Sequence, residues 1–320
     1  SLLSLHCTVL SQCRSMSLGI EVALNQTSTF NVKPPPELPP ERIGFADLIV
    51  DPDGKLRRSL LASKTYTGEL KYSLPLRLAQ VYLSKQGIAF HHGSRSKDPI
   101  QFGSSQLVRF LPNSGGYVRS DANGFQVLLN FRSHKQPFRT LSLRDILTGK
   151  VDPSWIRDRV IIVGMTAASV KDRFITSAVK RTLYTTVLGV EESFNHYQWI
   201  YGVEIHAHAT SQIISSVLDR RPLLKVWSDI WEYLWILAWG LLGIVLGLIL
   251  QSPWKTLLSL GIASIGLVGI CYIVLVVGWW IPLVPALLAL AGAGLTTSFF
   301  DRDLRSSTTR TALFNSQAII

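Results

Sequence analysis

The sequence predicts an α/β domain with a mixed, mainly parallel sheet, followed by three transmembrane α-helices. Strand-like and helix-like segments alternate through residues 1–228, which is typical of α/β folds. A continuous apolar run at residues 158–167, "DRVIIVGMTA", indicates a central parallel strand that is covered on both faces. Three uncharged stretches follow, and each is long enough to cross a bilayer as a helix.

The first expected strands surround a tight turn. A proline-rich stretch at residues 31–44 predicts an extended connector. After it we expect a strand at residues 45–50, a turn at residues 51–54 and a returning strand at residues 56–62. The turn sequence "DPDG" suits a β-turn because proline presets φ and glycine accepts the left-handed conformation. A calcium loop would need further oxygen ligands at regular spacing, which this stretch lacks.

The rest of the domain continues the alternation. The pattern predicts an amphipathic helix at residues 73–87, a buried strand at residues 124–133, a short helix at residues 141–149 and a longer helix at residues 202–222. We expect the insert at residues 176–201 to be a loop, near the membrane or over a pocket.

The membrane half divides into three spans, at about residues 233–250, 256–279 and 281–300, with a short tail at residues 301–320. Trp279 and Trp280, between the second and third spans, suit a headgroup interface. Gly243 and Gly247 form a GxxxG pattern, which permits close contact with another helix. No ionisable residue lies in mid-span, which argues against a transporter.

The charge of the chain lies in its first half. The formal net charge is +11, and residues 229–320 carry four charges of each sign, so residues 1–228 hold the whole excess. The charges are scattered, which fits a solvated surface; anionic ligands or a membrane surface are the alternatives. The chain has no long basic run, which argues against a nucleic-acid partner. The positive charges that flank the spans nearly balance, so they do not decide orientation.

Cysteine and motif content predict no cofactor, no metal and no catalytic residue. Cys7 and Cys13 could pair in an oxidising compartment or could be two small buried residues, and Cys271 lies in an apolar run. P-loop, GxSxG and kinase signatures are missing from the sequence. His206 and His208 are two residues apart on an expected helix, so they point to different faces and do not share one metal ion.

The candidate ligand-binding residues follow two of the expected strands or lie on the last helix. The stretch "GMTAASVKDRF" follows the central strand, where α/β sheets place ligands, although a purely structural loop is the alternative. A second strand ends in "NFR", whose amide and guanidinium could enter a pocket or satisfy loop carbonyls. The candidates are Asn130, Arg132, Thr166, Ser169, Lys171, Asp172 and His206.

Four stretches together carry a resemblance: "PPPELPPERIGFADLIVDPDGKLRRSLL", "LLNFR", "LSLRDILTGKVDPSWIRDRVIIVGMTAASVKDRF" and "GVEIHAHATSQIISSVLDRRP". In this combination and order, the chain resembles the type-2 CHASE domain, the cyclase/histidine-kinase-associated sensory extracellular domain. One family motif, D-x-F-x-T-P, falls on residues 172–177 with Ser177 in place of the proline. The family's first strand and helix have no counterpart here, so we expect an N-terminally incomplete domain.

The resemblance implies an extracytoplasmic sensor upstream of a kinase or cyclase. It places residues 1–228 outside a multi-pass inner-membrane protein and residues 301–320 in the cytoplasm. Because the family's ligand is unknown, no ligand residue carries over. We expect a sensory module that is not itself an enzyme, that binds an unknown small molecule and that moves its first span. A homodimer and a kinase or cyclase output module on a separate or missing chain are the expected partners, besides the lipid bilayer.

Two alternatives stay open. The chain could be a truncated receptor remnant without output. It could also be a membrane-anchored enzyme that acts on an anionic substrate through Lys171, Asp172 and His206. Alanine at Asp172 would abolish turnover in the second case.

Overall fold

The computed structural model describes residues 18–20, 38–65, 68–132, 138–170, 172–187, 190–250 and 252–317. The chain forms two compact units. We call the first the α/β unit; it contains the described residues up to Phe110 and those of Ala122–Leu223. The second, the helical unit, contains Leu224–Ile320 together with the loop Leu111–Asp121. Cys7 and Cys13 lie outside the described residues.

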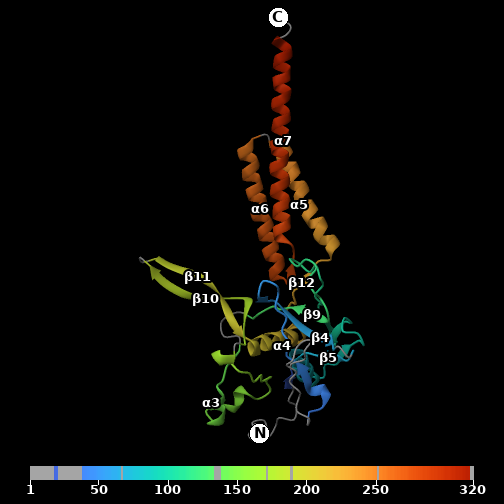
Figure 1. The fold of residues 1–320 in the computed structure, drawn as a ribbon, viewed down its shortest axis with the longest axis vertical. Helices are drawn as coiled ribbons and strands as arrows, with labels where there is room; N and C mark the ends of the chain where they lie inside the picture. The colour runs from blue at the N-terminus through green and yellow to red at the C-terminus, as the bar shows by residue number, and fades with distance from the viewer. Residues whose placement is uncertain are drawn as a thin grey trace. The chain divides into compact units, whose positions relative to one another are not determined.

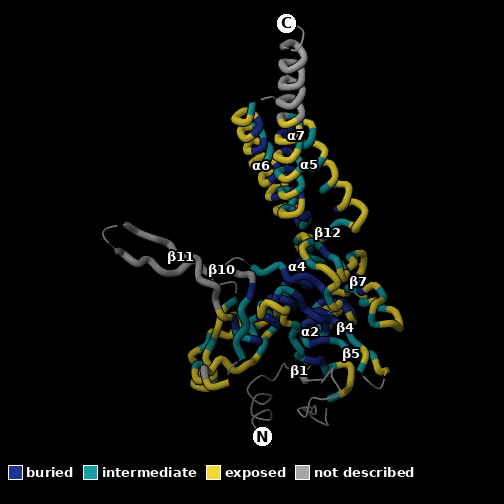
Figure 2. The backbone as a smooth tube through the Cα atoms, turned by 45° about the horizontal axis from the view of Figure 1, so that its top comes forward, coloured by how far each residue is buried: buried dark blue, intermediate teal, exposed yellow. Residues whose placement is uncertain are grey.

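The α/β unit is built around strand β4 (Arg58–Lys64), shown in Figure 1. β4 pairs antiparallel with β5 (Leu70–Tyr72) and with β9 (Phe125–Leu128). Helices α2 (Leu74–Ser84) and α4 (Gly202–Leu218) contact each other, and their apolar residues join the core of the sheet. Figure 2 shows the buried residues concentrated along α2, β4 and α4. The predicted helices at residues 73–87 and 202–222 are confirmed as α2 and α4, and the strand predicted at residues 56–62 falls mainly on β4. The strand predicted at residues 124–133 is shorter than expected, because β9 ends at Leu128.

The remaining elements of this unit are short, apart from one hairpin. Two pairs are parallel: β1 (Leu18–Ile20) with β2 (Ile43–Phe45), and β3 (Lys55–Leu56) with β10 (Arg173–Val187). The other described pairs are antiparallel, so the sheet content is mixed, as expected, but not mainly parallel. The short elements are β6 (Phe90–His92), β7 (Ile100–Phe102), β8 (Ser105–Gln106), α3 (Leu143–Leu147), and the 3-10 turns η1 (Pro40–Arg42), η2 (Pro153–Trp155) and η3 (Ala168–Val170).

The turn at residues 51–54 forms as predicted. The Gly54 backbone N–H donates to the Asp51 carbonyl at 2.8 Å, and Gly54 has a φ of 76°. This left-handed conformation is the one that glycine adopts without steric cost. The strand that was expected at residues 45–50 does not form, because β2 already ends at Phe45 and Ile49 makes only an isolated bridge to Arg58.

Two further sequence-based expectations are wrong. Residues 158–167 form no strand, and Val163 and Met165 are 75% and 66% exposed. A strand requires a hydrogen-bonded neighbour, and none of the described strands pairs with this segment. The insert at residues 176–201 is not a loop, because β10 and β11 (Val190–Tyr201) form a long antiparallel hairpin there.

The helical unit contains three long apolar helices, α5 (Asp229–Ile249), α6 (Pro253–Val276) and α7 (Leu283–Gln317). Candidate membrane spans are Asp229–Ile249, Pro253–Val276 and Leu283–Asp301. The short strands β12 (Lys225–Val226) and β13 (Trp279–Trp280) pair in parallel just before α5 and α7. The three predicted spans therefore correspond to three helices, although the first helix begins at Asp229 and the last continues to Gln317.

The GxxxG pattern of α5 faces another helix of the same chain. A Cβ atom on Gly243 would lie 2.3 Å from the Leu290 carbonyl oxygen of α7, and one on Gly247 would lie 2.1 Å from the Thr297 hydroxyl. Glycine is therefore required for this close backbone approach. The pattern is used for packing between α5 and α7 within one chain.

Candidate functional site

Strand β9 lies between two polar clusters in the α/β unit. All four of its residues are buried, and its apolar side chains join the core. One cluster surrounds the Gln126 side chain of β9, and the other lies just beyond the end of the strand, at Asn130 and Arg132. Buried polar groups need hydrogen-bond partners, so the polar residues in and after β9 are expected to be bonded within the protein.

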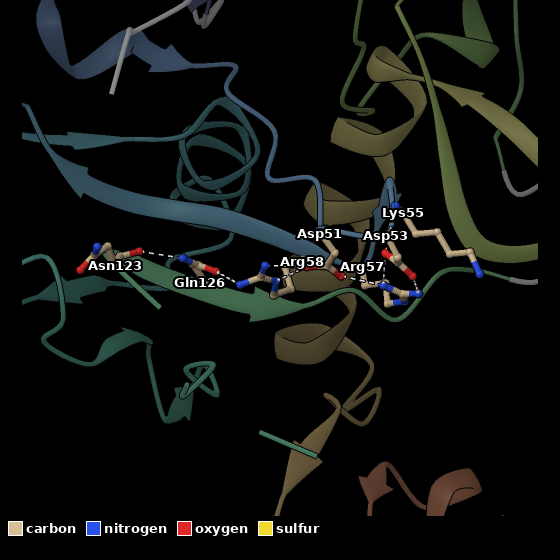
Figure 3. Close-up of polar contacts among 7 residues, drawn as sticks. All are labelled: Asp51, Asp53, Lys55, Arg57, Arg58, Asn123 and Gln126. Carbon is tan, nitrogen blue, oxygen red and sulfur yellow. Dashed lines mark hydrogen bonds and ion pairs between the residues drawn. The ribbon is translucent and has the colours of Figure 1, made fainter. Parts of the chain in front are cut away.

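The first cluster is a buried ion pair with its hydrogen bonds (Figure 3). The Arg58 and Asp51 side chains are 4% and 3% exposed, and Arg58 Nε donates to Asp51 Oδ1 at 2.9 Å. Arg58 Nη1 donates to Gln126 Oε1 at 2.9 Å, and Gln126 Nε2 donates to the Asn123 carbonyl at 2.8 Å. The cluster therefore ties the turn at residues 51–54 to β4, β9 and the residues that precede β9.

At the exposed edge of this cluster, a second arginine, Arg57, bridges Asp51 and Asp53. Arg57 Nη1 donates to Asp51 Oδ2 at 2.8 Å and to Asp53 Oδ1 at 3.0 Å. The hydrogen bonds from Arg57 lower the pKa of Asp53 to about 2. The buried Arg58 guanidinium also lies 4.7 Å from the centre of the Phe110 ring. Every acceptor in this cluster already faces a donor of the protein, so we assign the cluster a structural role.

The second cluster joins the end of β9 to helix α4. Gln212 bridges the two elements, because its Nε2 donates to the Leu128 carbonyl at 2.9 Å and its Oε1 accepts from the Asn130 backbone N–H at 2.7 Å. The Arg132 backbone N–H donates to His208 Nδ1 at 3.2 Å, and Arg132 Nε donates to the Ser211 hydroxyl. The two predicted site residues thus lie together against one face of α4.

Arg221 completes this cluster from the segment that follows α4. Its Nη2 donates to the Asn130 carbonyl at 2.9 Å and to the Phe131 carbonyl at 3.1 Å, while Asn130 Nδ2 donates to the Pro222 carbonyl at 3.2 Å. Burial lowers the pKa of Arg221, and the charge of Arg132 lowers it further. Among the described residues, Arg221 Nη1 is buried without a hydrogen-bond partner, and neither arginine has an ion pair with a carboxylate.

The backbone of Arg220, next to this second cluster, is strained. It has a φ of 52°, in the left-handed region that costs a non-glycine residue about 1 kcal/mol. The residues on either side are held by hydrogen bonds, because the Asp219 and Arg221 backbone N–H groups both donate to the Ser215 carbonyl. Arg221 was not among the candidate residues that the sequence suggested.

The other candidate residues lie elsewhere along the unit. Thr166 and Ser169 are exposed, and Lys171 lies outside the described residues. The Asp172 carbonyl accepts from the Gly202 backbone N–H at 3.3 Å, and the Asp172 carboxylate lies beside Gly202 at the start of α4. Among the described residues, no hydrogen bond joins these side chains to Asn130 or Arg132. A shared pocket for all seven candidates stays a prediction.

His206 is a buried residue of α4. It hydrogen-bonds to the backbone of Ala46, and burial lowers its pKa from 6.5 to about 4. It is therefore neutral at physiological pH. In the part of the chain that the structure describes, no group of three His, Cys, Asp or Glu side chains could hold a metal ion.

Comparison with known proteins supports the sequence resemblance. The family model of the CHASE2 domain matches residues 9–245, which is most of the chain. No match was found among curated proteins or among solved structures. The matched region spans the α/β unit and reaches into α5, the first of three helices that are long and apolar enough to cross a membrane. The chain belongs to the CHASE2 domain family, a family of extracellular sensory domains.

Proposed function

We propose that this chain is the sensory module of a membrane receptor. In this proposal the α/β unit faces the extracytoplasmic side of the inner membrane, binds a small ligand and passes a conformational change to α5. The observation that carries the proposal is the CHASE2 match over residues 9–245 together with three candidate spans that begin at Asp229. An odd number of spans would place the far end of α7 in the cytoplasm, where a kinase or cyclase output module would act.

The short connector between the units supports transmission. Helix α4 ends at Leu218, and α5 begins at Asp229. The first part of this segment is held by Arg221 and Pro222 against Asn130, and the second part forms β12. A ligand can shift such an equilibrium only by its difference in affinity for the two states. We also expect a homodimer, because a signalling helix needs a partner against which it can move.

Two neighbouring arginines of the second cluster, Arg132 and Arg221, favour a small anionic ligand; we call them the arginine cluster. Arg132 and Arg221 lie close enough for one charge to lower the pKa of the other, and among the described ion pairs neither has a carboxylate partner. An anion would relieve this repulsion and would supply an acceptor for guanidinium N–H groups. Carboxylate and phosphate oxygens both have the required chemistry.

A thermal-shift experiment on the full chain in nanodiscs tests the ligand assignment. Phosphate, sulfate and citrate would each be titrated, and an anion at 100 times its Kd should stabilise the α/β unit by about 2.7 kcal/mol. Arg132→Ala should abolish the shift, whereas Arg144→Ala, which removes an exposed arginine of α3, should leave it unchanged. An equal shift in both variants would exclude the arginine cluster as the site.

A further inference from the structure

The loop Leu111–Asp121 is an ordered segment that folds on itself. The Ser120 backbone N–H donates to the Pro112 carbonyl at 3.0 Å and closes the loop. Within it, the Leu111 N–H donates to the Ser114 hydroxyl at 2.9 Å, and the Arg119 N–H donates to Asn113 Oδ1 at 3.0 Å. Such internal bonds are typical of compact loops whose ends lie close together. We call this segment the coupling loop.

The coupling loop is part of the helical unit, although both of its ends continue into the α/β unit. Asn113 Nδ2 donates to Asp229 Oδ2 at 3.0 Å, in the first turn of α5. One turn further along α5, the carboxylate of Glu232 accepts a hydrogen bond from the Gly115 backbone N–H. The loop therefore holds the start of the first candidate span through two acidic residues.

The same loop also packs on the strand that precedes α7. The Tyr117 ring meets the Trp280 ring edge to face at 6.1 Å between centroids. A Cβ atom on Gly115 would lie 2.8 Å from the Trp280 ring, so a glycine is needed at this position for the contact. Trp280 belongs to β13, which pairs with β12 of the connector. The loop thus contacts the entry to α5 and the entry to α7.

Both ends of the loop are fixed inside the α/β unit. Arg109 Nη2 donates to the Ala122 carbonyl at 2.9 Å, and Arg109 Nε donates to the Gly124 carbonyl at 3.3 Å, so one side chain clamps the two stems. The Phe110 N–H donates to the Gln126 carbonyl of β9 at 2.7 Å. Gln126 is in turn held by Arg58.

We propose that the coupling loop transmits movements of β9 to the membrane helices, alongside the connector. Strand β9 is preceded along the chain by the coupling loop, and at its other end it contacts the segment that leads to α5. Before the strand, residues 122–124 lead from the loop; after it, Asn130 is hydrogen-bonded to Arg221 and Pro222 of the connector. This inference rests on the proposed receptor function, because it names the path by which a change in the α/β unit reaches α5.

Hydrogen exchange on the full chain in nanodiscs tests this path. The readout is the exchange of the Trp231 and Glu232 amides, which are bonded to the Ser228 carbonyl at the start of α5. Arg109→Ala removes the stem clamp and should raise their exchange rates by about threefold or more. The matched control is Arg77→Ala, which removes another partly buried arginine that donates to a backbone carbonyl, that of Ile43.

A second background separates the loop from the connector. In a chain that carries Asn113→Ala, Tyr117→Ala and Glu232→Ala, the loop has lost its side-chain contacts with Asp229 and Trp280 and the acceptor for the Gly115 N–H, so Arg109→Ala should add nothing to the exchange of α5. A further rise in this background would overturn the proposal and assign transmission to the connector alone. No difference between Arg109→Ala and Arg77→Ala in the original background would also overturn it.

Two controls separate loop-dependent coupling from general loosening of the α/β unit and from an inverted topology. A rise in exchange in α2 as well would mean that Arg109→Ala has loosened the α/β unit. The milder variant Arg109→Lys would then be measured in both backgrounds, and the same two outcomes would overturn the proposal. The exchange experiment depends on neither orientation nor ligand. An inverted topology would therefore remove the receptor function while leaving the loop-dependent coupling in place, and the two failures can be told apart.

Discussion

The two units of this chain are packed in different ways, one around a buried ion pair and the other through close contact between helix backbones. The α/β unit encloses a charged pair, Arg58 and Asp51, and surrounds it with donors and acceptors. In the helical unit, the contact between α5 and α7 is instead built on glycines that let the backbones approach. Only 17–22% of the 18-residue apolar window of each candidate span is buried inside the protein, as expected of helices that could lie in a membrane. Figure 2 shows these exposed faces along α5, α6 and α7.

This comparison teaches where each unit is fragile. A unit that buries a charge depends on keeping both partners, because the remaining charge would be left without compensation. A unit that relies on close backbone contact depends on the absence of a side chain. Removing a side chain should therefore be costly at the buried ion pair, whereas adding one should be costly at the glycines between α5 and α7.

The largest effect is expected at Arg58. Arg58→Met leaves the Asp51 carboxylate buried with Arg57 as its remaining cationic partner, and should cost about 3 kcal/mol of unfolding free energy. Urea unfolding of the α/β unit in the full chain measures this loss. Asp53→Asn is the control, since Asp53 is exposed and its loss should hardly change the midpoint. Equal losses for the two variants would contradict the buried-pair account.

Next in size is the packing of α5 on α7. Gly243→Leu places a side chain where the Leu290 carbonyl lies and should cost about 1–3 kcal/mol. Gly266→Leu is matched in chemistry, but nothing lies within 4 Å of its Cβ position, so it should be tolerated. Unfolding of the helical unit in mixed detergent micelles compares the two. If Gly266→Leu were the more damaging variant, α6 rather than α5 would carry the critical contact.

A smaller effect is expected from pH. The pKa of His206 is about 4 in the folded chain and 6.5 as an ordinary value, so the unfolded chain binds the proton more tightly. Stability should be constant above pH 6.5, and should fall as the pH drops from 6.5 toward 4, by about 2 kcal/mol at pH 5. The slope should disappear in His206→Gln, and a slope that persists in this variant would assign the effect to other groups.

Local signals predicted the parts of the fold that depend on a few neighbouring residues. The turn at residues 51–54 follows from proline and glycine, and the three spans follow from length and hydropathy. The strand expected at residues 158–167 failed because an apolar run does not specify a hydrogen-bonded neighbour. The contact between Arg221 and Asn130 joins residues 91 positions apart, and no local pattern announces it.

At the candidate site, too, the sequence indicates which residues matter but not which partners they have. The stretch "NFR" drew attention to Asn130 and Arg132, since a polar pair at the end of a buried strand must find partners, and their role in ligand binding stays a prediction. What those partners are depends on how α4 packs on β9, which only the tertiary structure reveals. The membership of the coupling loop in the helical unit depends on contacts with residues more than 100 positions away, such as Asp229, and no local pattern predicts these.

Thiol labelling from outside intact cells tests the receptor proposal most directly. Single cysteines at Ser154, exposed in the α/β unit, and at Asp303, beyond the last candidate span, would be compared in a chain whose native cysteines are replaced by serine. The proposal predicts that a membrane-impermeant reagent labels the cysteine at position 154 and reaches position 303 only after permeabilisation. Labelling at position 303 alone would place the α/β unit in the cytoplasm and contradict a receptor that senses outside the cell.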